Sequence, residues 1–171
     1  TSYIPNHSGG TITRGADFNS NNDIISTPIS FGANDDFTLY YEGSFDKSGS
    51  QGMIMGGGIV GAAADTKGYW WVRSSDLYLA GDAETTIATA SFSVVANTNY
   101  KLLVKRNGSV LDFFANGTKL TTNQVNPNTG FTFRSLGWSY SNAVYKISGD
   151  IKQALIFPDA LSDADCIALT S

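Results

Sequence analysis

The chain has 171 residues, a net charge of −4 and a sequence pI near 4.7. Its 18 glycines, 12% aromatic residues and only 15% charged residues are typical of a folded protein rich in β-structure. The sequence shows no cluster of lysine and arginine and no apolar stretch near the ~20 residues of a membrane span, so neither nucleic acid nor a membrane is an expected partner.

The first predicted strand, residues 36–45, alternates between apolar and polar positions. One face carries its apolar odd-numbered residues, which are Phe37, Leu39, Tyr41 and Phe45. The other face, which we expect to be wet, carries Thr38, Tyr40, Glu42 and Ser44. A strand with one core face and one solvated face is typical of an antiparallel sheet.

Residues 100–120 predict three consecutive strands joined by tight turns at Asn107-Gly108 and Asn116-Gly117, because Asn-Gly accepts the positive φ angles of two-residue hairpins. Further strands are expected at residues 53–55, 69–73, 76–79, 86–94, 131–138 and 145–157. The triple glycine at 56–58 lacks the rest of a phosphate-binding loop and is interpreted as a strand end or bulge.

One helix is predicted near the C-terminus, from Asp163 to about residue 169. Ser162 can cap it, Asp165 completes a capping box, and Leu161 can pack on Cys166. Because Cys166 is the only cysteine, no disulfide can form within the chain, and we expect a buried, inert thiol.

Several short motifs resemble laminin G-like jelly rolls, in the order in which that family has them. They are Asp17-Phe18-Asn19, Asp36-Phe37-Thr38-Leu39, Tyr100 to Val104, Asp112 to Lys119, Leu136-Gly137, Gly149-Asp150-Ile151 and Ala160 to Asp165. The resemblance implies an all-β, concanavalin A-like (laminin G-like) antiparallel jelly-roll sandwich over residues 16–171, with one short C-terminal helix.

A second resemblance concerns the first residues. Thr1-Ser2-Tyr3-Ile4-Pro5, followed by Thr11 to Asp17, is similar to a connector found in bacteriophage tail and other virion proteins. This likeness implies that residues 1–15 are an extended lead-in, that the chain is part of a larger phage protein, and that it resides in the virion or outside the cell, with other virion proteins as partners.

The residues that catalysis on such a fold would need are scarce. The paired carboxylates of a retaining glycosidase have no match, since the only glutamates are Glu42 and Glu84. The only histidine, His7, falls in the lead-in, which argues against a lyase base or a Ser-His-Asp triad. We therefore expect no catalytic residues, with a glycan hydrolase that uses Glu42 as an alternative.

Oxygen-rich stretches at residues 17–23 and 34–36 could bind a structural Ca²⁺, although the same residues also make ordinary Asx turns. No other cofactor is expected, and the sequence leaves the calcium question open.

The strongest sign of a binding surface is the segment 68–73. Alternation places Tyr69, Trp71 and Arg73 on one face, and because arginine is seldom buried we expect that face to be wet. The complete predicted set of ligand-binding residues is Tyr69, Trp71, Arg73, Asp76, Tyr78, Trp138, Tyr140 and Asn142. The alternative is that these aromatic residues fill a second core or a subunit interface.

The sequence thus predicts a non-catalytic, lectin-like carbohydrate-binding module of a phage tail fibre or similar appendage, which recognises host surface polysaccharide. The alternatives are a structural or decoration domain of the virion that binds protein, and a glycan hydrolase on the same fold.

Overall fold

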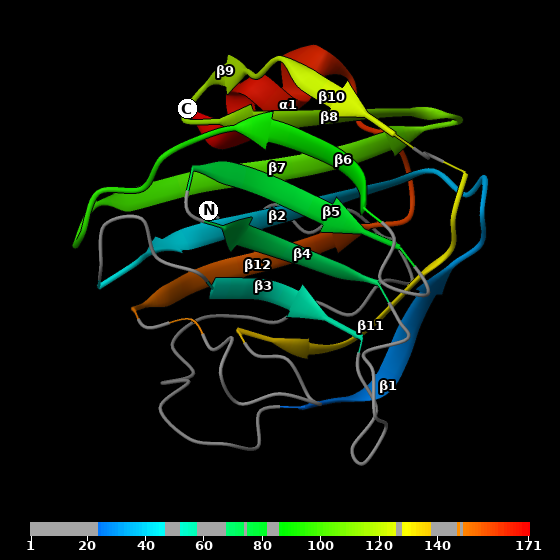
Figure 1. The fold of residues 1–171 in the computed structure, drawn as a ribbon, viewed down its shortest axis with the longest axis horizontal. Coiled ribbons are helices and arrows are strands. Elements are labelled where there is room, and N and C mark those ends of the chain that lie inside the picture. Colours follow the sequence, from blue (N-terminus) through cyan, green and yellow to red (C-terminus); the bar gives the residue numbers. More distant parts are fainter. Residues whose placement is uncertain are drawn as a thin grey trace.

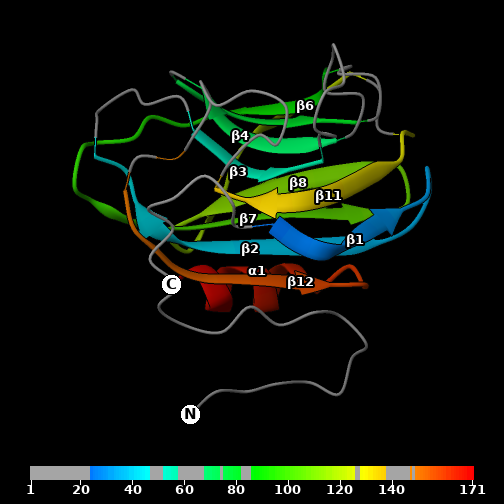
Figure 2. The same cartoon turned by 90° about the horizontal axis from the view of Figure 1, so that it is seen from below.

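The computed structural model shows two antiparallel sheets packed face to face (Figures 1 and 2). It describes residues 24–46, 52–57, 68–73, 75–81, 86–125, 128–137, 147 and 149–171. The predicted lead-in therefore lies outside the described residues. Among those residues, no helix is long and apolar enough to cross a membrane.

Each sheet has a crossed strand order, as expected for a jelly roll. The seven-stranded sheet runs β1 (Ile24–Phe31), β11 (Phe131–Leu136), β3 (Gly52–Gly56), β4 (Tyr69–Arg73), β5 (Asp76–Ala80), β6 (Thr86–Ser91) and β10 (Thr122–Gln124). The five-stranded sheet runs β12 (Ile151–Phe157), β2 (Phe37–Ser44), β7 (Asn99–Asn107), β8 (Val110–Ala115) and β9 (Thr118–Lys119).

The core lies between the sheets and is filled by the apolar positions of alternating strands. In β2, Phe37, Leu39 and Tyr41 are fully buried there, as predicted. From the opposite sheet, Trp70 and Val72 of β4 enter the same cluster. The period of two along each strand therefore decides which side chains become core.

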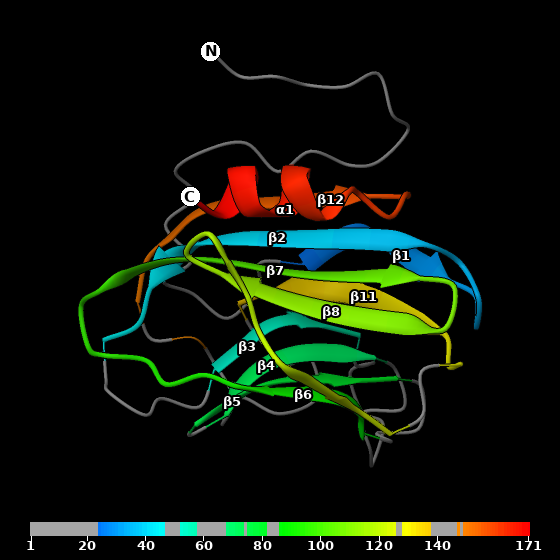
Figure 3. The ribbon, with the colours of Figure 1, turned by 90° about the horizontal axis from the view of Figure 1, so that it is seen from above.

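The other face of β2 is not wet, so that expectation is wrong for Thr38 and Tyr40, which are both buried. The reason is the helix α1 (Asp163–Thr170), which packs across the outer face of the five-stranded sheet (Figure 3). Thr38 Oγ1 donates to the carbonyl of Asp159 at 2.8 Å and accepts from the amide of Leu161 at 3.0 Å. The residues before the helix are thus fixed to the sheet.

The predicted cap and hydrophobic contact of this helix are confirmed. Ser162 Oγ accepts from the amide of Asp165 at 3.1 Å, and Leu161 packs against the cluster that contains the fully buried Cys166. Burial raises the pKa of the Cys166 thiol to about 11, which is consistent with an inert thiol.

One of the two predicted hairpin turns lies one residue later than expected. Asn116 and Gly117 have φ angles of 45° and 78°, as a type I′ turn needs. The preceding hairpin is closed by the pair Asn107 and Val110, so its turn residues are Gly108, with φ of 58°, and Ser109. A single glycine at the first turn position is the type II′ arrangement.

Three predicted strands are shorter than expected. Within the described residues, β6 ends at Ser91, β11 ends at Leu136 and β12 begins at Ile151. β11 stops because Gly137 turns to a φ of 72°, and its amide donates to the carbonyl of Ile54 at 2.8 Å. The interpretation of the triple glycine as a strand end is confirmed at Gly56, the last residue of β3.

A fully buried arginine ties the two sheets together at one end of the sandwich. Arg106, on β7, has no exposed surface. Its Nε donates to the carbonyl of Asp35 at 2.6 Å, its Nη1 to that of Thr129 at 2.6 Å, and its Nη2 to that of Gly32. Its guanidinium carbon lies 4.9 Å from the ring centroid of Phe37 and 5.0 Å from that of Phe131. Burial lowers the pKa of Arg106.

We expect Arg106→Met to lower the free energy of unfolding by about 3–5 kcal/mol, because it removes three charge-assisted hydrogen bonds from a fully buried guanidinium and leaves their acceptor carbonyls without these donors. Urea denaturation measures the change. Lys152→Met, on the exposed part of β12, is the control and should change stability by less than about 0.5 kcal/mol. Equal midpoints for the two variants would contradict this role of Arg106.

Candidate functional site

Three aromatic residues gather on the outer face of the seven-stranded sheet. The rings of Tyr69 and Tyr78 are stacked, with centroids 6.1 Å apart and an interplanar angle of 8°. Trp71 and Tyr78 meet edge to face, with ring centroids 6.0 Å apart. Met53 and Ala80 complete this cluster. The predicted faces are therefore correct, since Trp70 and Val72 point into the core instead.

The exposure of the cluster differs from the prediction. Tyr69 and Trp71 each have only 8% of their surface exposed, so the expected wet platform is wrong for these two residues. Tyr78 is half-buried and lies at the more accessible side of the cluster. Contacts among the rings and with Met53 account for part of the burial. The alternative of a second, smaller core thus describes Tyr69 and Trp71.

Two charged residues border the cluster. Arg73 is exposed, and its guanidinium carbon lies 5.7 Å from the ring centroid of Trp71. Asp76 is half-buried and is the cross-strand partner of Arg73, with the hydroxyl of Ser75 at 3.4 Å from its carboxylate. A cation over an indole ring, beside a carboxylate, offers donors and an acceptor next to an apolar surface.

Of the eight predicted ligand-binding residues, the structure brings together Tyr69, Trp71, Arg73, Asp76 and Tyr78. The other three, Trp138, Tyr140 and Asn142, lie outside the described residues.

Sequence reasoning missed three polar residues on the same face. Thr89 and Ser91 of β6 are the cross-strand partners of Tyr78 and Asp76, and Asn123 of β10 is the partner of Thr89. Because Ala88 and Ala90 of β6 enter the core, alternation along this strand could have predicted that Thr89 and Ser91 lie on the outer face. The pairing of β10 with β6 gave no signal in the sequence.

Two of the carboxylates predicted as possible calcium ligands bond to backbone amides instead. Asp35 Oδ2 accepts from the amide of Gly32 at 2.6 Å, and Asp36 Oδ1 accepts from the amide of Gly108 at 2.7 Å. Residues 17–23 lie outside the described part of the chain. Among the described residues, no group of three or more His, Cys, Asp or Glu side chains could hold a metal ion.

Glu42, the alternative catalytic residue, lies on the outer face of the other sheet. It is half-buried, and its carboxylate accepts from Tyr40 Oη and from Asn99 Nδ2, each at 3.3 Å. Burial, together with the charge of Glu42, raises the pKa of Tyr40. Because the core separates the two outer faces, Glu42 cannot act on a molecule bound at the aromatic cluster.

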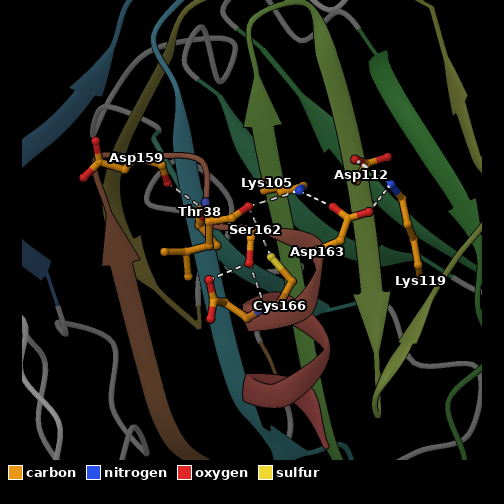
Figure 4. A network of polar contacts seen from close by, with 10 residues as sticks. Thr38, Lys105, Asp112, Lys119, Asp159, Ser162, Asp163 and Cys166 are labelled. Atoms are coloured by element: carbon orange, nitrogen blue, oxygen red, sulfur yellow. Dashed lines mark hydrogen bonds and ion pairs between the residues drawn. The ribbon is translucent and has the colours of Figure 1, made fainter.

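A polar network holds α1 against the five-stranded sheet (Figure 4). Lys105 is buried, and its Nζ donates to the carbonyl of Leu161 at 3.1 Å and to the carboxylate of Asp163. Lys119 Nζ lies 2.9 Å from Asp163 Oδ2 and 3.0 Å from Asp112 Oδ2. Because these groups bond to one another and to the backbone, we interpret the network as structural.

The hydrogen bonds from Lys105 and Lys119 hold the pKa of Asp163 below its usual range. A carboxyl with a lower pKa in the folded than in the unfolded chain stabilises the fold above the unfolded pKa, near 3.9, and this stabilisation is lost as the pH falls.

We therefore expect Asp163→Asn to lower the free energy of unfolding by about 1 kcal/mol at pH 6, and the difference from the natural chain to shrink as the pH falls below about 4 through the lowered pKa of Asp163. Urea titrations across this pH range measure it, with Asp150→Asn, at an exposed carboxylate, as the control. A difference that persists unchanged at pH 2 would show that Asp163 acts through packing instead.

Comparison with family models and with curated proteins gives no match. Solved structures do match. The CBM40 module of the IT-sialidase from Ruminococcus gnavus, bound to α2,3-sialyllactose, has a TM-score of 0.64 at 15% identity, over 81% of this chain and 83% of that chain. The native heptameric SAP-like pentraxin from Limulus polyphemus has a TM-score of 0.60 at 12% identity, over 94% and 80%.

The NanB sialidase of Streptococcus pneumoniae matches with a TM-score of 0.64 and 14% identity, over 92% of this chain but only 28% of that chain. At such low identities these likenesses establish the fold alone. The chain is an all-β, concanavalin A-like jelly roll with a short C-terminal helix, which confirms the predicted fold class.

Proposed function

We propose that this domain is a non-catalytic carbohydrate-binding module that binds glycans at the outer face of its seven-stranded sheet. The observation that carries the proposal is the aromatic cluster of Tyr69, Trp71 and Tyr78, with Arg73 and Asp76 at its border. The fold is shared with a module that was solved with sialyllactose bound, which supports the same class of ligand here.

The chemistry of the surface suits a sugar better than a purely apolar ligand. A pyranose ring has a face of C–H groups that packs on an aromatic ring, and hydroxyls around its edge. Tyr78 offers ring surface, while Arg73 donates hydrogen bonds and Asp76 accepts them. The buried Tyr69 and Trp71, on the neighbouring strand, pack against Tyr78 from the side, so its ring is held in place before a ligand arrives.

The biological setting is proposed from the first residues. Their similarity to a phage connector supports a place in a tail fibre or other virion appendage, where the module recognises host surface polysaccharide. The chain would then be found in the virion or outside the cell, with other virion proteins as neighbours. The net charge of −4 is consistent with a partner other than nucleic acid.

We expect Tyr78→Ala to weaken binding at least tenfold, because it removes the most accessible ring of the cluster, and Tyr78→Phe to keep most of the affinity. An array of bacterial surface polysaccharides, followed by calorimetric titration of the strongest binder, measures both variants.

The absence of any glycan signal would overturn the proposed function. If the natural chain then formed oligomers in light scattering, and Tyr78→Ala made it monomeric, the same surface would be a protein interface of a virion structural domain.

A further inference from the structure

A straight row of side chains runs across the strands on the outer face of the seven-stranded sheet. Cross-strand pairing aligns it in the order Met53, Trp71, Tyr78, Thr89 and Asn123. Neighbouring strands are ~4.8 Å apart, so the part of the row from β4 to β10 is about 14 Å long. This is longer than one sugar ring.

The row becomes more accessible along its length. Met53 is 2% and Trp71 is 8% exposed, whereas Tyr78 and Thr89 are half-buried and Asn123 is exposed. The apolar end is therefore closed, and the polar end is open to solvent. β10 is also the last strand of its sheet among the described residues, so the row ends at an edge.

The neighbouring residues along β6 and β10 show on which face of the sheet Thr89 and Asn123 lie. Ala88 and Ala90, on either side of Thr89, are both buried in the core. Gln124, next to Asn123, turns its side chain to the opposite sheet, where Oε1 accepts from the amide of Leu111 at 3.0 Å. Thr89 and Asn123 consequently point outward, on the same side as Tyr78.

A second row lies beside the first, two residues further along the strands. It consists of Arg73, Asp76 and Ser91, which are cross-strand partners in that order. Two residues along a strand correspond to about 7 Å, so the two rows together form a strip rather than a point. The charges of Arg73 and Asp76 are opposite, and the other polar groups of the strip are neutral hydroxyls and an amide.

We propose that the ligand is an uncharged oligosaccharide chain that lies across the strands, from Tyr78 to the edge at Asn123, with successive sugar units over the strip. This inference rests on the proposed function and narrows it. Thr89, Ser91 and Asn123 become specificity-determining residues that bond to hydroxyls of the units beyond the aromatic cluster. Because the strip ends at an open edge, the chain continues into solvent, and internal segments of a long polysaccharide bind as well as its ends.

The test compares chain length and variants on one array. It carries linear chains of glucose, galactose, mannose and N-acetylglucosamine, from monosaccharide to hexasaccharide, together with lactose and 3′-sialyllactose. We expect the affinity to rise with length up to about the trisaccharide, since the strip is about 10–14 Å long. Asn123→Ala and Thr89→Val should each weaken binding of the longer chains about threefold to tenfold and leave binding of monosaccharides, which reach only the aromatic cluster, unchanged. Gln153→Ala, at an exposed amide on β12 of the other sheet, is the matched control.

Each other outcome overturns the proposal in a distinguishable way. Glycan binding that is independent of length, or strongest for 3′-sialyllactose, would keep the proposed function and remove the inferred chain. Equal effects of Asn123→Ala and Gln153→Ala on the longer chains would do the same. No binding to any glycan, here or on the polysaccharide array, would remove both the function and the chain.

Discussion

The sandwich depends on one buried cation. A guanidinium without exposed surface is costly unless its donors are satisfied, and Arg106 satisfies them with backbone carbonyls of Gly32, Asp35 and Thr129. These carbonyls belong to the connection between β1 and β2 and to the residues before β11. A residue of the five-stranded sheet thereby binds segments next to β1 and β11 of the other sheet, and the rings of Phe37 and Phe131 lie against its guanidinium.

The outer faces of the two sheets differ in what covers them. The five-stranded sheet is covered by α1, which buries Tyr40 and is fixed by the ion pairs of Lys105 and Lys119 with Asp163. On the seven-stranded sheet, the described strands carry the aromatic cluster instead. The polar network beneath α1 is thus structural, and the surface proposed to bind a glycan lies on the other side of the core.

The aromatic cluster combines rigidity with access. Rings that are packed against one another lose little conformational entropy when a ligand binds, because they have already been ordered by folding. The buried Tyr69 and Trp71 provide that order, and the half-buried Tyr78 marks the transition to the polar strip. A surface that changes from apolar to hydrogen-bonding over three strands matches a molecule with C–H faces and hydroxyl edges.

The sequence by itself determined the described strands other than β1 and β10, the I′ turn at Asn116-Gly117, the helix with its Ser162 cap, and the faces of Tyr69, Trp71 and Tyr78. All of these follow from neighbours within a few residues. The tertiary structure alone decided what covers each face. The sequence did not indicate that Arg106 would be buried, because the carbonyls that accept its hydrogen bonds lie 71, 23 and 74 residues away in the chain. Tyr40 became buried through a helix more than a hundred residues later, and Asn123 joined Tyr78 through strand pairing across β6. Alternation reports the side on which a residue lies, whereas burial depends on distant segments that no local pattern encodes.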